Sequence, residues 1–195
     1  MSMPYDTMSD TPDEALLVLY ANGDVAAARA LTMRLTPRAL GFATRVLHDH
    51  AEAEDVAQEA MLRLWKIAPD WRQGEAKITT WLYQVVSNLC TDRLRKKRGV
   101  GLDAVPEPED TRPSAAQGLV EAERAAALAA ALTELPDRQR QVVVLRHLEG
   151  ASNPEIAQVL EISVEAVESL TARGLRALKA ALAARRAELG YNDDE

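Results

Sequence analysis

The sequence predicts an all-α protein: two small helical domains joined by a flexible acidic linker, with a helix-turn-helix in the C-terminal domain. The chain has 195 residues, 47% of them hydrophobic but only 4% aromatic. This Ala- and Leu-rich composition favours helices over a β-sandwich or barrel. Capping residues, prolines and glycines divide the chain into helix-sized segments. Within those segments apolar residues recur at intervals of three and four, which is the spacing of one helix face.

Composition also excludes several classes of protein. No run of 18 apolar residues is present, so no segment is predicted to span a bilayer. Residues 1–11 contain two acids and no basic cluster, unlike a signal peptide. The single cysteine, Cys90, excludes an internal disulfide and a multi-cysteine zinc site, and we expect it to be a small buried hydrophobe. We therefore expect a cytoplasmic protein without a metal or cofactor. With no Ser-His-Asp grouping or glycine-rich phosphate loop, the chain is not predicted to be an enzyme.

The first predicted domain, residues 11–98, is divided into helices by its capping signals. Thr11 to Glu14 have the pattern of a capping box, Gly23 is a helix-terminating glycine, and Asp24 and Asp49 are N-cap residues. Pro37 is expected to end one helix and to begin the next. The predicted helices are residues 12–22, 24–36, 37–48, 49–68 and 79–97.

Residues 99–113 are predicted to link the two domains. They contain three prolines and four acids and no periodic apolar pattern, which is typical of a flexible tether. The 15 residues of this segment reach at most about 50 Å when fully extended. We therefore expect the domains to separate freely unless a partner holds them together.

The second predicted domain, residues 114–190, contains the helix-turn-helix. Ser114 opens a capping box, Pro136 restarts the chain, Asn153 caps a short helix and Ser163 caps the last one. The predicted helices are residues 114–134, 136–149, 153–160 and 163 onward. Apolar residues around the last turn have the spacing of two short crossing helices: Ile156, Ala157, Leu160, Ile162, Val167 and Leu170.

The last helix is expected to present a polar face to the DNA major groove. The candidate contacts on it are Ser163, Glu165, Ala166, Glu168, Ser169, Arg173 and Arg176. Glu168 lies beyond the first turn, where the helix dipole favours an anion. It either repels phosphates and restrains non-specific binding, or accepts a hydrogen bond from a cytosine amino group. The alternative is that this domain is a packing module without a DNA role.

A second group of residues points to single-stranded nucleic acid. Near the end of the 79–97 helix lie Arg93, Arg95, Lys96, Lys97 and Arg98, and close in sequence lie Trp71, Trp81 and Tyr83. Cations follow phosphates and aromatic rings stack on unpaired bases. One polar helix face is expected to carry Gln84, Asn88, Thr91, Arg95 and Arg98. The alternative is that the rings are core residues and the cations a solvated helix end.

Charge is unevenly distributed along the chain. The net charge is −7, which argues against a protein that coats nucleic acid non-specifically. Residues 1–99 hold 13 basic and 13 acidic residues, whereas residues 119–195 hold 9 and 13. The acidic excess thus lies in the linker and the second domain.

Taken together, these features resemble an extracytoplasmic-function sigma factor of bacterial RNA polymerase, of the sigma-70 family. The resemblance covers nearly all of both predicted domains, in the family's order and spacing. It rests on Ala53–Glu59, Leu62–Trp65, Thr80–Tyr83, Asn88, Asp92–Arg95, Leu135–Pro136, Arg140, Val144–His147, Glu155–Ala157 and Ser163–Val164.

The resemblance implies a protein that directs core polymerase to promoters and melts them. The residues implied to bind the clamp helices of the largest polymerase subunit are Asp55, Gln58, Glu59, Leu62 and Arg63. Those implied to bind the minus-ten element are Trp71, Lys77, Asn88, Arg93, Arg95, Lys96 and Arg98. The last helix would read the minus-thirty-five element. Further implied partners are the flap of the second-largest subunit and an anti-sigma factor, and the acidic linker would pass through the RNA channel or simply stay solvated.

The chain departs from the family pattern near its last helix, and two other functions remain open. Glu161 replaces the turn glycine, while Ala166, Glu168 and Leu170 stand where Thr, Lys and Arg are common. The promoter sequence that is read is therefore open. A helix-turn-helix transcriptional regulator with a helical sensor domain would leave the clamp-binding block unexplained. A sigma mimic that only titrates an anti-sigma factor would not need the basic cluster.

Overall fold

The computed structural model describes residues 8, 10–72, 74, 77–99 and 116–188, and the regular structure within them is helical. In chain order the elements are α1 (Asp13–Ala21), α2 (Val25–Leu47), α3 (His50–Ile67), a 3₁₀ turn η1 (Ala68–Asp70), α4 (Ile78–Gly99), α5 (Ala116–Thr133), α6 (Asp137–Val143), a π turn η2 (Val144–Leu148), α7 (Asn153–Leu160) and α8 (Val164–Glu188). The predicted all-α class is confirmed. No helix in these ranges is long and apolar enough to cross a membrane.

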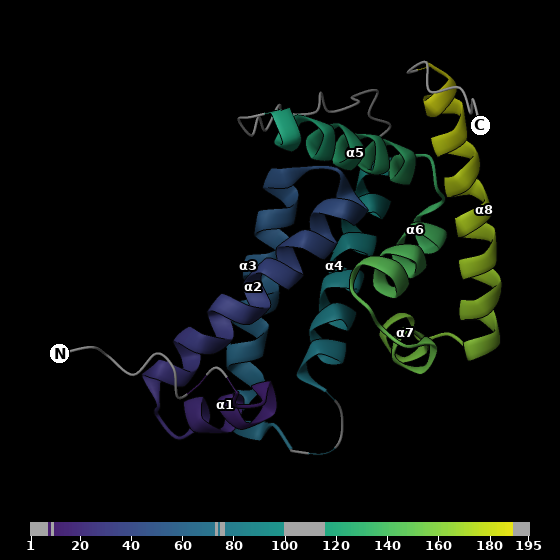
Figure 1. The fold of residues 1–195 in the computed structure, drawn as a ribbon. Helices are drawn as coiled ribbons and strands as arrows, with labels where there is room; N and C mark the ends of the chain where they lie inside the picture. Colours follow the sequence, from purple (N-terminus) through teal and green to yellow (C-terminus); the bar gives the residue numbers. More distant parts are fainter. Residues whose placement is uncertain (1–7, 9, 73, 75–76, 100–115, 189–195) are drawn as a thin grey trace.

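The first domain is a bundle in which α2, α3 and α4 pack along their lengths and α1 lies across one end (Figure 1). Each long helix buries one apolar face, with Leu35, Phe42, Leu64 and Leu82 fully shielded from solvent. The opposite faces carry the charges. This burial of one face explains why the sequence has helical periodicity here.

The predicted helix boundary at Pro37 is wrong, because Pro37 lies inside the continuous helix α2. A proline in a helix leaves the carbonyl four residues earlier without its usual partner. That residue is Met33, which is 64% exposed, so the freed carbonyl is on the solvent side of the helix. Leu31 and Leu35 on the opposite face are fully buried, and their packing holds the helix together across the proline.

Several capping predictions are confirmed. Asp24 accepts hydrogen bonds from the backbone N–H groups of Ala26 and Ala27 at 2.8 and 3.2 Å. Asp49 accepts one from Glu52 at 3.1 Å. Gly23 has the positive φ expected of a terminating glycine.

Two other capping predictions are wrong. Thr11 to Glu14 form no capping box; instead Glu14 accepts a hydrogen bond from the backbone N–H of Ile78 at 3.2 Å, at the start of α4. The cap of α7 is Ser152 rather than Asn153, in a capping box with Glu155. The predicted Ser114 capping box and nearly all of the 99–113 linker lie outside the described residues.

In the second domain, α5 crosses one end while α6, α7 and α8 form the helix-turn-helix unit (Figure 1). The predicted helix 136–149 is a short α-helix that continues as the π turn η2 and ends before Gly150. At the turn between α7 and α8, Glu161 has φ 54° and ψ 47°. This is the left-handed conformation that a glycine would favour, so the expected strain of the substitution is present.

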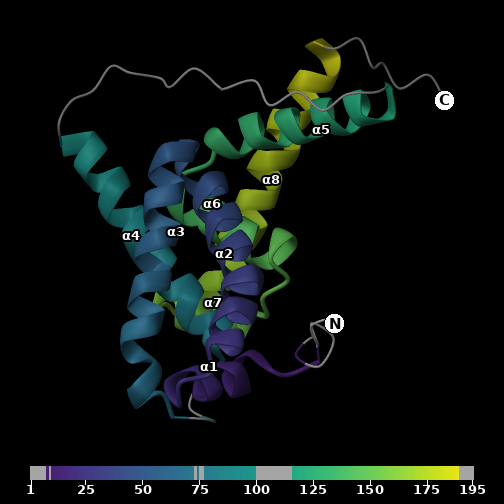
Figure 2. The ribbon, with the colours of Figure 1, turned by 90° about the vertical axis from the view of Figure 1, so that its left-hand side faces the viewer.

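The two domains are packed against each other, contrary to the expectation that they lie apart without a partner. Helix α7 packs on α4, and α2 contacts α5, α6 and η2. The buried residues of both domains form one continuous apolar cluster. Figure 2, turned from the first view, also shows α5 lying across the ends of the first-domain helices.

Candidate nucleic-acid interface

The five residues predicted to bind polymerase share one face of α3. They lie at helical spacings of three and four, and the opposite face of α3 is buried in the core. Leu62 lies within this face and is 53% exposed. Arg63 donates a hydrogen bond to Glu59 at 2.5 Å beside it. An apolar residue surrounded by charged and polar side chains has the composition of a protein interface.

The polar row predicted along α4 lies on one face of the helix, because its five residues fall within about 80° of the helix circumference. Part of this row contacts the second domain; with Lys77, which directly precedes α4, we call this part the inner row: Lys77, Gln84, Thr91 and Arg98. Asn88 and Arg95, with Lys96 beside them, are exposed and form what we call the outer face. The second domain therefore covers only part of the predicted polar face.

The basic cluster of α4 is largely occupied by acids of its own chain. Arg93 is turned toward α3, where it pairs with Glu52 and lies 3.7 Å from Asp55. Lys97 lies 2.9 Å from Asp49 and is the main cause of the lowered pKa of that carboxyl.

Arg95 and Lys96 remain exposed. Arg95 is 78% exposed and lies 3.7 Å from Asp92 in a loose contact on the same helix. Lys96 is also exposed. These two cations are the members of the cluster best placed to meet phosphates from solvent.

The aromatic residues are more buried than a base-stacking surface requires. Tyr83 is 6% exposed, packs on the ring of Phe42 with centroids 5.5 Å apart, and donates its hydroxyl proton to Glu149 at 2.6 Å. Burial, together with Glu149, raises the pKa of this hydroxyl, so it remains a donor. Trp71 and Trp81 are half-buried and contact each other edge to face at 6.4 Å. The core interpretation therefore holds for Tyr83.

The outward face of α8 is accessible. Of its seven candidate contacts all but the half-buried Ala166 are exposed. Ser163 caps the helix as predicted, accepting from the backbone N–H of Ala166 at 3.2 Å. Arg173 donates to the Ser169 hydroxyl at 3.0 Å, which holds its guanidinium over the helix surface. Because the second domain docks through α7, on the other side of the helix-turn-helix, α8 stays free of the first domain (Figure 1).

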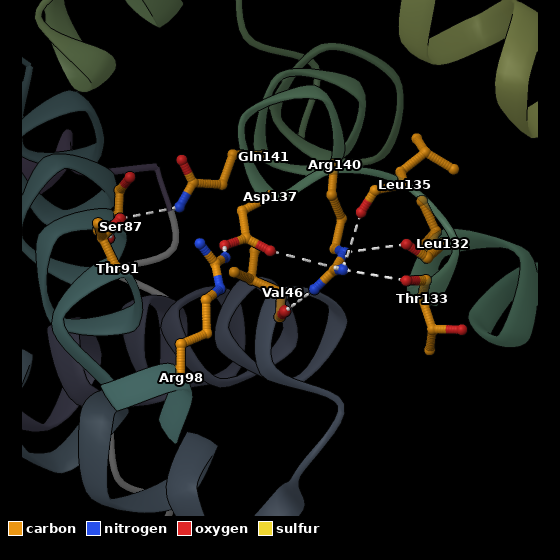
Figure 3. A network of polar contacts seen from close by, with 10 residues as sticks. All are labelled: Val46, Ser87, Thr91, Arg98, Leu132, Thr133, Leu135, Asp137, Arg140 and Gln141. Carbon is orange, nitrogen blue, oxygen red and sulfur yellow. Dashed lines mark hydrogen bonds and ion pairs between the residues drawn. The ribbon is translucent and has the colours of Figure 1, made fainter. Parts of the chain in front are cut away.

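A buried polar network at α6 was missed by sequence reasoning (Figure 3). Arg140 is 6% exposed and donates to the carbonyls of Leu132, Thr133 and Leu135 and, across the domain boundary, to that of Val46 at 2.6 Å. Gln141, 1% exposed, donates to the Thr91 hydroxyl at 3.1 Å. The available signal was two adjacent polar residues that directly precede the apolar run 142–145.

The described residues contain no group of three or more His, Cys, Asp or Glu side chains that could hold a metal ion. Cys90 is buried as predicted, and burial raises the pKa of its thiol to about 12. The thiolate needed for redox or metal chemistry is therefore strongly disfavoured.

Family models match both domains. Residues 31–100 match sigma-70 region 2 and residues 125–178 match sigma-70 region 4. These ranges contain α3 and α4 in the first domain and the helix-turn-helix in the second.

Known proteins are similar over most of the chain. The extracytoplasmic-function (ECF) sigma factor SigW of Bacillus subtilis is 32% identical over 148 residues, which cover 69% of this chain and 78% of SigW. SigE of Mycolicibacterium smegmatis is 31% identical over 182 residues, covering 90% and 70%.

Solved structures have the same fold. CnrH in complex with the cytosolic domain of CnrY has a TM-score of 0.64 at 27% identity, covering 88% of this chain and 97% of that one. The sigma factor RpoE of Bartonella quintana in complex with the anti-sigma factor NepR has a TM-score of 0.63 at 20% identity, covering 79% and 95%.

Sigma factors are regulatory DNA-binding factors rather than classical enzymes. Regions 2 and 4 together bind core RNA polymerase and promoter DNA. The accessible faces of α3, α4 and α8 fall within these two regions. This chain therefore belongs to the ECF sigma factors of the sigma-70 family, and it directs RNA polymerase to promoters and initiates transcription there.

Proposed function

We propose that this sigma factor divides its work among three surfaces on two functional domains, residues 11–98 and 114–190. The exposed face of α3 binds the clamp helices of the largest polymerase subunit. The outer face of α4, with the segment between α3 and α4, binds and opens the minus-ten element. The outward face of α8 reads the minus-thirty-five element. The observation that carries this division is that each of the three faces is exposed while the opposite face of its helix is buried.

Leu62 is the residue on the α3 face whose exposure is hardest to explain without a partner. Placing Asp there should weaken binding to core polymerase at least tenfold without unfolding the chain, because the side chain is already 53% exposed. Val25→Asp is the matched control, since it changes a 79% exposed apolar residue at the start of α2. Pull-down with core polymerase and circular dichroism measure both. Equal binding by folded Leu62→Asp and Val25→Asp would reject the clamp role of α3.

Arg95 and Lys96 are proposed to hold phosphates of the minus-ten region, with Asn88 reading a base edge. The double variant Arg95→Ala/Lys96→Ala should impair open-complex formation more than polymerase binding. Each phosphate contact steepens the salt dependence of binding, so the double variant should have a shallower dependence and its defect should shrink as salt rises. Lys66→Ala, an exposed cation on α3, is the control. Equal loss of polymerase binding in the double variant would mean that these residues contact polymerase rather than DNA.

The proposed minus-ten surface also includes Trp71, Lys77, Arg93 and Arg98. Arg93 is engaged with α3, and Trp71 is half-buried. Lys77 and Arg98 are paired with Glu155 and Asp137 of the second domain, although their side chains stay 70% and 69% exposed.

Glu168 is proposed to restrain non-specific binding by α8 rather than to read a base. Its side chain is exposed, and the second domain is already acidic. Glu168→Lys should tighten binding to all DNA and steepen the salt dependence by about one unit while promoter choice survives. Loss of discrimination at a single base pair, measured over single-base promoter variants, would instead identify Glu168 as a base reader. Arg173→Ala should weaken promoter binding under either role.

The remaining partners follow from the same assignment. We propose that the second domain also contacts the flap of the second-largest polymerase subunit, that the protein acts in the cytoplasm without a cofactor, and that an anti-sigma factor regulates it. The solved relatives in complex with CnrY and NepR support the last point. Co-purification of the chain from its host with and without core polymerase tests it.

A further inference from the structure

The basic cluster at the end of α4 is divided between two sides of that helix. Arg93 and Lys97 are one turn apart, and both are turned toward α3, where they pair with Glu52 and Asp49. Arg95 lies on the other side, with a side chain that is 78% exposed, against 23% for that of Arg93. The structure therefore turns Arg93 away from the outer face of α4 and toward α3.

Acids follow one another along the side of α3 that Arg93 meets. The proposed polymerase-binding face there consists of Asp55, Gln58, Glu59, Leu62 and Arg63. Glu52 lies one turn before Asp55, and Glu59 lies one turn after it. Like charges at these spacings repel each other. Arg63 of the same helix pairs with Glu59 at 2.5 Å. Within the residues that the structure describes, the cation that pairs with Asp55 comes instead from α4, and it is Arg93.

Arg93 is placed between two of these acids. Its Nη1 donates a hydrogen bond to Glu52 and lies 3.7 Å from Oδ2 of Asp55. Burial acts to lower the pKa of this guanidinium, but the carboxylates of Glu52, Asp55 and Glu59 raise it above its usual value. The planar fork of an arginine suits such an arrangement better than the single ammonium of a lysine. Arg93 therefore offsets the repulsion among the acids of α3 and restrains the Asp55 side chain.

We propose that Arg93 is a positioning residue of the polymerase-binding face, where it holds the Asp55 carboxylate in place for a cationic group of the polymerase. The proposal rests on the proposed role of α3 in binding the clamp helices, and it adds a second role to the DNA contact expected for Arg93. The Asp55 side chain is 69% exposed, so it stays open to a partner while it is held. A side chain already restrained in one orientation loses less conformational freedom on binding.

The same contact also ties α4 to α3, so its effect on binding has to be separated from its effect on folding. Lys97 provides the comparison, because it makes an ion pair with Asp49 at 2.9 Å between the same two helices. Asp49 is the N-cap of α3 and lies outside the polymerase-binding face. Loss of Lys97 therefore loosens the contact between α3 and α4 without releasing Asp55.

The test compares Arg93→Met, Lys97→Met and the exchange variant Glu52→Arg/Arg93→Glu in the full chain. The exchange moves the arginine to α3, one turn before Asp55, where it can still pair with that carboxylate. Titration of each dye-labelled chain with core polymerase, without DNA, measures the affinity by fluorescence anisotropy. Urea denaturation measures the stability of each variant. If Arg93→Met does not fold, Arg93→Lys replaces it, because it keeps the charge but lacks the planar fork.

We expect Arg93→Met to weaken binding to core polymerase about two- to tenfold, which is the cost of ordering one side chain. The exchange variant should recover most of this loss, and Lys97→Met should bind as the parent chain does.

Unchanged or tighter binding by Arg93→Met would overturn the positioning role. Equal losses in Arg93→Met and Lys97→Met, or an exchange variant as weak as Arg93→Met, would also overturn it. Leu62→Asp in the same titration tests the α3 face itself. If Leu62→Asp binds normally, the proposed clamp role of α3 is wrong. If Leu62→Asp loses binding while Arg93→Met keeps it, the clamp role stands and only the role of Arg93 is rejected.

Discussion

Arg140 is expected to contribute more to the stability of this protein than any exposed arginine, and its environment allows the effect to be bounded. Its guanidinium donates to four backbone carbonyls at 2.6 to 3.1 Å, and the residue is 6% exposed. Two of these carbonyls, those of Leu132 and Thr133, belong to the last turn of α5, which lacks helical partners there. Removing the side chain takes a donor from all four carbonyls, although that of Leu132 also accepts from the backbone N–H of Leu135 at 3.2 Å and Thr133 is exposed.

The magnitude follows from two opposing contributions. A hydrogen bond from a charged donor contributes about 1.5–3 kcal/mol, but the contributions of one group do not add. Against them stands the cost of burying the guanidinium, which is also why the pKa of Arg140 is lowered. Leaving a buried neutral acceptor without its donor costs about 1–3 kcal/mol, and because these costs do not add in full, the net loss is about 2–4 kcal/mol. This is a large part of the stability of an ordinary domain, about 5–15 kcal/mol.

Urea denaturation followed by circular dichroism at 222 nm measures this loss for Arg140→Met. Arg138→Met is the matched control, because Arg138 lies on the same helix, is exposed and donates one bond, to Leu160 at 3.2 Å. It should lose no more than about 1 kcal/mol. Arg140→Lys should fall between the two, since an ammonium cannot reach carbonyls in a planar fork. Equal stabilities of Arg140→Met and Arg138→Met would refute the structural role of this network.

Two further predictions concern glycine and histidine positions. A Cβ on Gly174 would lie 2.6 Å from Val143 Cγ2, so Gly174→Ala should destabilise the protein by about 1–3 kcal/mol. A Cβ on Gly41 would meet only the flexible end of Arg45, so Gly41→Ala should stabilise the protein by about 0.5–1 kcal/mol. Urea midpoints of the two variants that shift in the same direction would contradict this. Burial lowers the pKa of His48 from 6.5 to about 4. As the pH falls, the unfolded chain therefore takes up a proton at this histidine before the folded chain does. The free energy of unfolding should fall by about 0.5–1 kcal/mol from pH 7 to 5.5, after allowance for the partial exposure of the ring. His48→Asn, which suits the left-handed backbone at φ 54°, should abolish this pH dependence, and an unchanged slope would assign it to another group.

Features decided within a few residues of sequence were predictable. Asp24, Asp49 and Ser163 cap helices because their side chains reach N–H groups two or three residues away, whatever the rest of the chain does. The exposed face of α3 was predictable because its opposite face is apolar at helical spacing. The boundary predicted at Pro37 was wrong because the cost of a proline is local, while the burial of Leu31 and Leu35 that outweighs it comes from packing against other helices.

Features that depend on the meeting of the two domains were not predictable in the same way. Gln84, Asn88 and Thr91 share one polar face of α4, and only the second domain distinguishes them: Glu161 contacts Gln84 and Gln141 contacts Thr91, whereas Asn88 stays exposed. Arg140 matched the family pattern, but its partner Val46 at the end of α2 lies 94 residues away in sequence. The need for Gly174 likewise arises from the crossing of α6 and α8.

Transcription by core polymerase on a pool of genomic promoter fragments, with and without this chain, tests the central claim most directly. We expect new transcript start sites that depend on the added protein and that share two short conserved sequence blocks more than one helical turn, about 34–36 Å, apart. Leu62→Asp should abolish all of them together, while Arg173→Ala should weaken them. An absence of new start sites, or start sites that survive Leu62→Asp at full strength, would contradict the account.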